Sequence, residues 1–316
     1  MTVLQSAPQR ILGFDVAKDT IALFDSASGQ TETMPNRPAA IRRRLAGLDG
    51  ADLAVCEPTG GHEAALLQEL LAANIPCHRA DTLKLKAFIR SFGTLAKTDA
   101  LDAQALARYG QERWTHLILF ELPDADQQAL CDLVTRRQQL VEMKVAENNR
   151  AKGARVSNAL KASCRAMLRT LNAQITRIER AIDALVAQST ALAETVARYR
   201  ELPGIGPRTA QGLAAFMPEL GHLSRRQAAA LAGVAPHPSD SGTRRGYRSM
   251  RGGRPQVRAV LFMAALAAAR AKGPLKAFYN RLIQNGKKPI VAIAALMRKI
   301  IVILNARQRD ALNQQS

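Results

Sequence analysis

Residues 130 to 199 contain no proline and a single glycine, Gly153, so little in this stretch could end a helix. In its second half, apolar side chains recur every three or four residues. They are Leu168, Leu171, Ile175, Ile178, Ile182, Leu185, Leu192, Val196 and Tyr199, with Ser189 as the interruption. This heptad spacing predicts long helices that form a coiled coil, and such an apolar seam requires a partner helix.

The chain before this stretch alternates strand and helix signals. The segment "RILGFDVAKDTIALFDSASGQTETMP" predicts two adjacent strands with a turn at residues 17–19, and a second turn leading to a third strand. A short apolar strand in "ADLAVCEPTGG" is followed by a helix in "HEAALLQELLAAN", a strand in "IPCHRA" and a helix in "TLKLKAFIRSF". This order indicates an α/β domain over about residues 8–115.

Charge divides the chain into three parts, which we take as the expected domains. Residues 1–122 contain 13 Lys or Arg and 14 Asp or Glu, a net charge of −1. Residues 123–200 contain 13 and 8, a net charge of +5, and residues 201–316 contain 19 and 4, a net charge of +15. A strongly basic C-terminal part indicates a polyanionic partner, although a generally basic soluble protein has the same signature.

Several classes of protein are not indicated. The four cysteines, Cys56, Cys77, Cys131 and Cys164, form no CxxC pair and no cluster with metal-ligand spacing, which favours a reducing compartment. The N-terminus lacks an apolar signal segment, and Arg298 with Lys299 interrupts the apolar run "PIVAIAALMRKIIVIL", which therefore predicts a buried helix. We expect a cytoplasmic protein with no membrane partner.

Two stretches carry candidate nucleic-acid contacts. "YRELPGIGPRTAQGLAAF" resembles a helix-hairpin-helix element, in which Gly204 and Gly206 turn the chain and expose N–H groups to a DNA phosphate. Its GxG string lacks the preceding strand and third glycine of a dinucleotide site. The helical segment carries a basic face that includes Lys152 and Arg155, which is either a solvated surface or a nucleic-acid contact.

Four carboxylates are the first candidate catalytic group. Asp15 ends one predicted strand and Glu57 another, while Asp99 and Asp102 stand three residues apart on one face of a predicted helix. Each alone is equally consistent with a turn, a helix N-terminus or a solvated charge. Their order matches the carboxylate layout of the RNase H-like fold, and an oxygen-rich cluster suits Mg²⁺ or Mn²⁺.

A basic loop holds the second candidate group. Ser239, Ser241 and Ser249 lie in "LAGVAPHPSDSGTRRGYRSMRGGRPQVR", and no acidic residue follows Ser241 until after Arg309. The arginines of this stretch are Arg244, Arg245, Arg248, Arg251, Arg254 and Arg258. By residue type alone, such a serine is either a hydrogen-bond donor to phosphate or a nucleophile that cations must activate.

Together these motifs resemble the transposases of the Piv/MooV type. The matching stretches are "GFDVAKD", "CEPTGG", "KTDALDAQALA", "LPGIGPRTA", "LAGVAPHPSDSG" and "NGKKPIVAIAALMRKII". The resemblance implies a RuvC-like DEDD domain at residues 1–122, a basic helical coiled-coil segment at residues 123–200, and a mainly α C-terminal transposase domain at residues 201–316. In this layout the helical segment serves oligomerisation and RNA contact.

The resemblance also implies a chemistry. Asp15, Glu57, Asp99 and Asp102 would bind divalent metal, and Ser241 would attack double-stranded DNA to form a covalent phosphoserine link, with Ser239 ranked second. A structured non-coding guide RNA is implied as a further partner. We also expect a homo-oligomer, in which the carboxylates of one protomer meet the serine of another. The alternative is a RuvC-like, structure-selective nuclease or junction resolvase that uses water as nucleophile. A non-catalytic nucleic-acid-binding protein is a second alternative.

Overall fold

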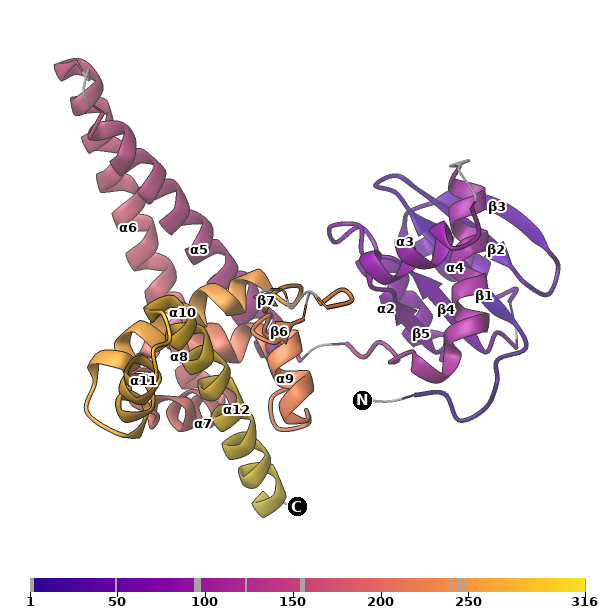
Figure 1. Cartoon of the computed structure of the whole chain (residues 1–316). Helices are drawn as coiled ribbons and strands as arrows, with labels where there is room; N and C mark the ends of the chain where they lie inside the picture. Colours follow the sequence, from indigo (N-terminus) through magenta and orange to yellow (C-terminus); the bar gives the residue numbers. More distant parts are fainter. Residues whose placement is uncertain are drawn as a thin grey trace. The chain divides into compact units, whose positions relative to one another are not determined.

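The computed structural model describes residues 3–48, 50–93, 98–122, 124–153, 157–238, 240–243, 246 and 248–315. The chain divides into two compact units, residues 1–122 and residues 123–316 (Figure 1). Each unit has its own hydrophobic core, and each is described by itself.

The first unit is built on a five-stranded sheet of order β3-β2-β1-β4-β5. Strands β1 (Ile11–Val16), β2 (Thr20–Asp25) and β3 (Gln30–Pro35) pair antiparallel, whereas β4 (Leu53–Cys56) and β5 (Cys77–Arg79) continue the sheet parallel to β1. This mixed sheet confirms the α/β domain that the sequence predicts over about residues 8–115.

Helices cover both faces of the sheet because alternate strand residues point to opposite sides. Leu12 and Phe14 pack towards α1 (Pro38–Leu45) and α2 (Ala64–Ala72), and α1 is a helix that the sequence analysis did not predict. Ile11 and Val55 pack on the other face, towards α3 (Thr82–Arg90) and α4 (Asp99–Arg113), which the short 3-10 turn Trp114–His116 follows.

Helix α4 lies unusually close to β1. A Cβ built on Gly13 would stand 2.0 Å from the carbonyl oxygen of Ala103 and 2.7 Å from the backbone nitrogen of Ala107. One turn further along, a Cβ on Gly110 would stand 2.9 Å from a methyl group of Val55. Two glycines therefore let the helix backbone lie directly on the strand.

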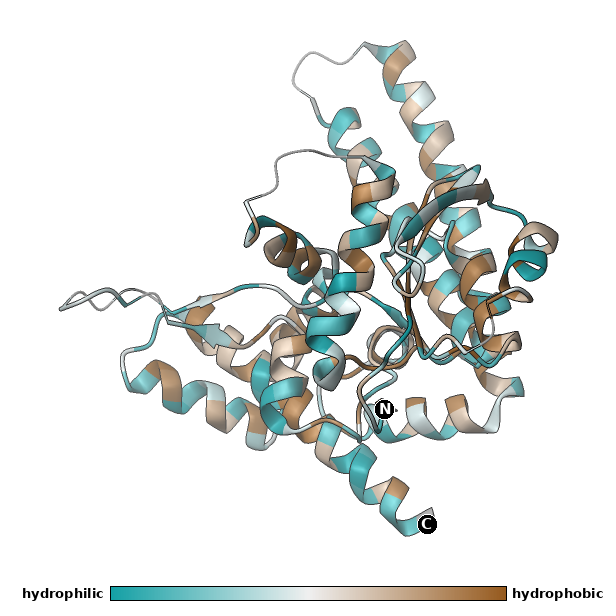
Figure 2. Cartoon of the chain, turned by 90° about the vertical axis from the view of Figure 1, so that its right-hand side faces the viewer, coloured by the Kyte–Doolittle hydropathy of each residue, from teal (hydrophilic) through white to brown (hydrophobic). Residues whose placement is uncertain are grey.

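The second unit begins with a helical hairpin. Helices α5 (Ala125–Ala151) and α6 (Asn158–Gln188) pack against each other, with Leu140 of α5 against Leu171 and Ile175 of α6. An ion pair at 2.6 Å between Arg137 and Glu179 adds a polar tie. Apolar and polar residues alternate around these helices (Figure 2).

The partner of the heptad seam is thus a helix of the same chain. α5 covers the seam at Leu171 and Ile175, and the extended backbone at Ser189 separates α6 from α7 (Thr190–Arg200). Beyond this break, Val196 and Tyr199 enter the main core instead of continuing a coiled coil. The seam has the partner helix that its pattern requires, and it therefore gives no support to a second protomer.

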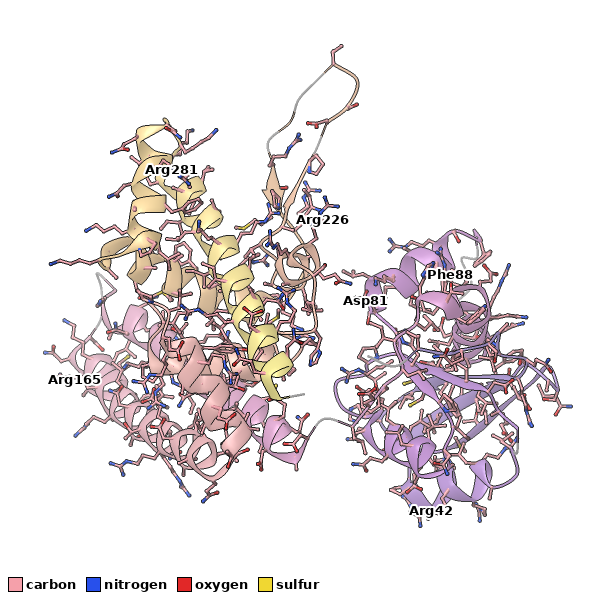
Figure 3. All side chains as sticks on the ribbon, turned by 90° about the horizontal axis from the view of Figure 1, so that it is seen from below. Arg42, Asp81, Phe88, Arg165, Arg226 and Arg281 are labelled. Atoms are coloured by element: carbon pink, nitrogen blue, oxygen red, sulfur yellow. The ribbon has the colours of Figure 1, made fainter. Side chains whose placement is uncertain are left out.

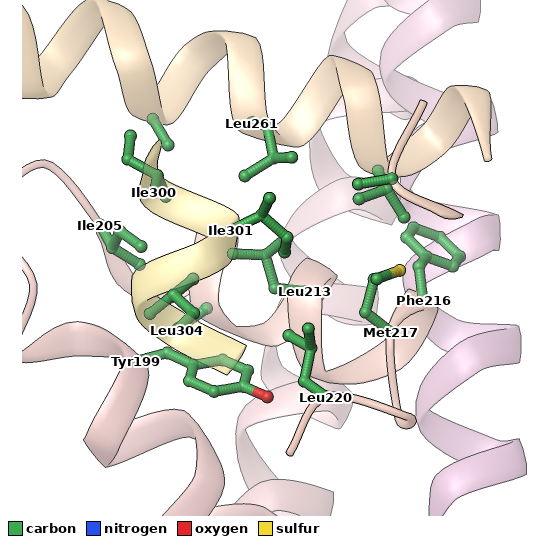
Figure 4. Packing of buried hydrophobic residues seen from close by; sticks show 14 of the residues in the cluster. Tyr199, Ile205, Leu213, Phe216, Met217, Leu220, Leu261, Ile300, Ile301 and Leu304 are labelled. Atoms are coloured by element: carbon green, nitrogen blue, oxygen red, sulfur yellow. The ribbon is translucent and has the colours of Figure 1, made fainter. Parts of the chain in front are cut away.

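The helical segment and the C-terminal part share one core, although we expected them as separate domains. Tyr199 of α7 belongs to the same buried cluster as residues of α8, α10 and α12, and it lies near Leu304 of α12 (Figure 4). The remaining elements are α8 (Pro207–Phe216), α9 (Arg225–Leu231), β6 (Pro236–His237), β7 (Ser249–Met250), α10 (Pro255–Arg270), α11 (Pro274–Gln284) and α12 (Pro289–Gln315).

α12 organises this core. Ile300 and Leu304 are fully buried, and the amide of Asn305 bonds the backbone of Gly221 and Leu223 at 3.0 and 2.7 Å. By length and composition alone α12 could cross a membrane. Because its central residues fill the core of this unit, it is a buried helix, as the sequence analysis predicted.

Replacing Gly13 tests the contact between α4 and β1. Gly13→Ala would place a methyl group inside the backbone of α4, so we expect the free energy of unfolding of the full chain to fall by about 3 kcal/mol. Gly47→Ala is the control, because its Cβ would meet nothing closer than 3.7 Å, and we expect a change below about 1 kcal/mol. Denaturant unfolding measures both, and equal stabilities would contradict the close packing.

Candidate functional site

Two of the predicted carboxylates lie at the same end of neighbouring parallel strands: Asp15 is the second-last residue of β1, and Glu57 directly follows β4. Phe14 of β1 pairs with Cys56 of β4, so Asp15 and Glu57 come one residue later at the same edge of the sheet. By strand alternation Asp15 shares the face of Ile11 and Glu57 that of Val55, which is the face that α4 covers. Both side chains are half-buried.

The close approach of α4 brings the other two carboxylates to this edge. Gly110 lies over the beginning of β1 and Ala103 over its middle, so α4 runs opposite to β1 and its first turn lies towards Asp15. That first turn contains Asp99 and Asp102, and the Thr98 hydroxyl caps it by accepting the Leu101 N–H at 3.3 Å. A helix N-terminus also stabilises negative charge electrostatically.

The four carboxylates are a donor set that fits a hard divalent cation, since all of their ligand atoms are oxygens. In the part of the chain that the structure describes, no three His, Cys, Asp or Glu side chains stand close enough to hold an ion. Asp99 is exposed, and Asp102 is half-buried. The carboxylates therefore share an edge and a face, and their side chains must turn towards one another to ligate one cation.

Glu63 holds the loop that carries Glu57, and the sequence analysis did not single it out. Only 4% of Glu63 is exposed, and its Oε2 accepts from the Thr59 N–H, the Thr59 hydroxyl and the Gly61 N–H at 2.9–3.1 Å. Arg79 of β5 lies 3.6 Å from its other oxygen. Burial raises the pKa of Glu63, but these hydrogen bonds outweigh it and hold the pKa below its ordinary value.

Asn36 connects the same loop to the turn after β1. Its side-chain N–H group donates to the carbonyl of Ala17 at 2.9 Å and to the carbonyl of His62 at 3.0 Å. Ala17 lies two residues after Asp15, and His62 lies in the loop after Glu57. No sequence pattern marks an asparagine that joins two loops in this way, so only the fold reveals that Asn36 connects them.

Ser241 lies in the second unit, in the loop between β6 and β7. These two short strands pair through Pro236 with Met250 and His237 with Ser249. Asp240 accepts from both the Arg248 guanidinium, at 2.7 and 2.8 Å, and the Gly246 N–H at 3.1 Å. The hydrogen bond from Arg248 holds the pKa of Asp240 below its ordinary value. Ser241 is exposed, and its hydroxyl bonds to none of the described residues.

Some predicted nucleic-acid contacts are engaged inside the protein. Arg254 pairs with Glu219 at 2.5 and 2.8 Å and donates to the Phe216 carbonyl, so it ties α10 to α8. Gly204, at φ +94°, lies so close to α10 that its Cβ would meet Ala268 at 2.6 Å, so it is a packing residue. The reason in both cases is tertiary packing that the local sequence does not reveal.

Other predicted contacts remain open to solvent. Gly206 caps α8 with nothing near its Cβ position, and Lys152, Arg248 and Arg251 are exposed, although Arg248 is paired with Asp240. Figure 3 shows Arg165, Arg226 and Arg281 projecting from this unit. Four predicted site residues, Arg155, Ser239, Arg244 and Arg245, lie outside the described residues.

Two sequence families match these two regions in order. The DEDD transposase family of the IS110 type matches residues 12–154, which contain all four carboxylates. The transposase family IS116/IS110/IS902 matches residues 196–280, which contain Gly206 and Ser241. The chain belongs to the IS110/IS116/IS902 family of transposases. It is therefore an enzyme of DNA recombination that catalyses phosphoryl transfer, and the alternative of a non-catalytic nucleic-acid-binding protein was wrong.

Curated relatives agree with this family. The chain is 26% identical over 253 residues to the pilin gene-inverting protein of Moraxella lacunata, covering 79% of this chain and 77% of that protein, and the Moraxella bovis protein matches equally. It is 31% identical over 157 residues to the insertion element IS110 uncharacterized 43.6 kDa protein of Streptomyces coelicolor, covering 46% of this chain and 38% of that protein.

Among solved structures, T. thermophilus RuvC in complex with Holliday junction substrate matches 35% of this chain and 99% of its own, with 13% identity and a TM-score of 0.28. The N-terminal fold of this transposase is therefore defined by its own strand order and strand directions.

Replacing Glu63 tests its role in this transposase. We expect Glu63→Gln to lower the free energy of unfolding by about 2 kcal/mol at neutral pH, because an amide accepts hydrogen bonds more weakly than a buried carboxylate. Since folding lowers the pKa of Glu63, its contribution is present above its ordinary value of 4.5 and is lost as pH falls through the lower folded value.

The difference between wild type and Glu63→Gln should therefore shrink in acid, and unfolding followed across pH measures it. Glu112→Gln is the matched control, because Glu112 forms an exposed ion pair with Arg108 on α4. A difference for Glu63→Gln that stays constant with pH would contradict the assignment.

Proposed function

We propose that this transposase excises and inserts its DNA element by serine attack on the DNA backbone. Asp15, Glu57, Asp99 and Asp102 bind divalent metal, and Ser241 is the nucleophile. The observation that supports the proposal is the placement of the four carboxylates towards one edge and one face of the sheet, within a region that a transposase family matches. Ser241 is exposed, and it lies within a region that a second transposase family matches.

The serine requires activation from outside its hairpin. Its hydroxyl bonds to no described side chain, and the nearest acid, Asp240, is already paired with Arg248. In the step that we propose, Ser241 Oγ bonds to phosphorus and loses its proton, while the sugar oxygen leaves and becomes a hydroxyl. Attack of a strand hydroxyl on the phosphoserine reverses this chemistry and rejoins DNA.

The carboxylate edge contributes what the serine lacks. A divalent cation, Mg²⁺ or Mn²⁺, bound there would stabilise the charge that develops on the phosphate oxygens. Glu63 and Asn36 keep the two strand-end loops in place, so that Asp15 and Glu57 stay at one edge. The carboxylates and Ser241 lie in different units of the chain, so we propose that the working enzyme is an oligomer with shared sites.

An oligomer also has surfaces available for its assembly. On the outer half of the α5–α6 hairpin, four apolar side chains are about half exposed: Met143, Val145, Leu160 and Met167. The same region carries the exposed cations Arg150, Lys152, Lys161, Arg165 and Arg169.

We propose that these cations contact a structured guide RNA that is encoded beside the gene. We also propose that the enzyme is cytoplasmic. Recovery with the purified protein of a discrete RNA from the DNA that flanks the gene would support this partner. Full recombination by protein treated with ribonuclease would contradict it.

Replacing Ser241 separates a recombinase from a nuclease. We expect Ser241→Ala to abolish strand cleavage and the covalent protein–DNA adduct together, measured with end-labelled element DNA on denaturing gels. The matched control is Ser249→Ala, on β7 of the same hairpin, which should retain both. Continued cleavage by Ser241→Ala would instead support the junction-resolvase alternative, in which water is the nucleophile. Loss of the adduct only in Ser239→Ala would move the nucleophile to that residue.

Replacing a carboxylate tests the metal site. We expect Asp102→Asn to reduce cleavage at least about 100-fold, and a chelator to abolish wild-type cleavage until Mg²⁺ or Mn²⁺ is restored. Glu112→Gln, at the other end of α4, is the control and should remain active. Full activity of Asp102→Asn would remove it from the site.

Mixing inactive proteins tests shared sites. An equal mixture of Asp15→Ala and Ser241→Ala should recover part of the cleavage activity if one protomer supplies the carboxylates and another the serine. No recovery at any ratio would contradict shared sites.

A further inference from the structure

The largest cavity described in the second unit lies at the base of the hairpin that carries Ser241. It has a volume of about 620 Å³, and its walls come from both hairpin strands, α9, α11 and the first half of α12. Pro236, Arg248 and Met250 are the contributions of the hairpin. We call this cavity the hairpin pocket. It is as large as ordinary small-molecule sites, which occupy roughly 300–1,000 Å³.

The hairpin pocket combines an apolar interior with a cationic rim. Met250, Ala294, Ala295 and Val302 are among its apolar wall residues, and none of its 13 lining residues is acidic. Its cations are Arg225, Arg248, Arg298 and Lys299. Arg225 and Arg298 are exposed and have no ion-pair partner among the described residues.

This chemistry favours a nucleotide over a protein. A nucleobase is flat and largely apolar on its faces, and its flanking phosphates suit a rim of guanidinium and ammonium groups. The second unit of another copy is a poor occupant of this pocket, because the charged lining residues are all cationic and residues 123–316 contain 32 Lys or Arg and 12 Asp or Glu.

The hairpin places this pocket close to the proposed nucleophile. Pro236 of β6 lines the pocket and lies five residues before Ser241, a separation that an extended chain spans in at most about 18 Å. At about 3.4 Å per nucleotide along one strand, this is roughly five nucleotides. A strand whose phosphate lies at Ser241 can therefore reach the pocket with a nearby base.

We propose that the hairpin pocket receives one unpaired base of the DNA strand that Ser241 attacks, within about five nucleotides of the attacked phosphate. Arg225, Arg298 and Lys299 hold the adjoining phosphates. The bound base anchors the strand next to the covalent link and keeps its end in place until it is rejoined. The proposal rests on the proposed function of Ser241, but its test requires no recombination.

The test measures binding of two probes to the full-length protein by fluorescence anisotropy. One probe is a fluorescein-labelled oligomer of abasic deoxynucleotides, and the other is the same backbone with one thymine at its centre. We expect the thymine to tighten binding about tenfold, because the apolar pocket removes a base from water. Arg298→Ala should weaken binding of both probes, because it removes a contact to phosphate.

Filling the pocket should erase the preference for the base. In Ala294→Phe, and in the smaller change Ala295→Leu, we expect both probes to bind with the affinity of the bare backbone. The matched control is Ala277→Phe, an exposed position of α11 that does not line the pocket and should keep the tenfold preference. The second filling variant keeps the test decisive if Ala294→Phe does not fold.

Four outcomes would overturn the inference. Equal affinity of the wild type for the two probes would show that no base enters the pocket. If the wild type still binds the abasic probe in that case, the proposed function of Ser241 is not contradicted. An unchanged preference in both filling variants would place the base elsewhere. Tighter binding of the corresponding ribonucleotide probe would assign the pocket to RNA. If the wild type and the control self-associate and the two filling variants do not, the hairpin pocket binds a second copy of the chain.

Discussion

The contact between helix α4 and strand β1 is the constraint on which the carboxylate edge depends. Gly13 allows the backbone of α4 to lie on the strand, at a distance where any side chain would overlap the Ala103 carbonyl. The contact fixes the direction of α4 relative to β1 and the distance between the helix and the strand. Asp99 and Asp102 therefore begin the helix at the same edge where Asp15 and Glu57 end their strands.

The carboxylates and Ser241 have different structural surroundings. Asp15 lies in a strand, and Glu57 lies in a loop that the buried Glu63 and the half-buried Asn36 hold through hydrogen bonds. Ser241 lies in the loop of a short two-stranded hairpin, in which an exposed ion pair joins Asp240 and Arg248. An acidic sheet edge and a basic C-terminal part suit an enzyme that must bind a polyanion and stabilise the charge that develops on a phosphate.

Much of this organisation could be predicted from the sequence. The strand-helix alternation predicted the N-terminal α/β domain because buried strands and amphipathic helices leave strong periodic signals. The acids at strand ends and the serine in the basic loop were visible by residue type. Glu63 and Asn36 were not predicted, because their roles consist of hydrogen bonds to loops that are distant in sequence. Arg254 and Gly204 were taken for nucleic-acid contacts because their internal partners come from other helices.

The sequence by itself determined most of the secondary structure, the uneven charge and the candidate reactive groups, since these depend on local pattern and composition. Only the tertiary structure decided what the apolar seam packs against. Its pattern requires burial against a helix but does not say which one, and α5 of the same chain covers it at Leu171 and Ile175. Likewise, the hairpin pocket exists only because residues from α9, α11, α12 and the Ser241 hairpin meet in space.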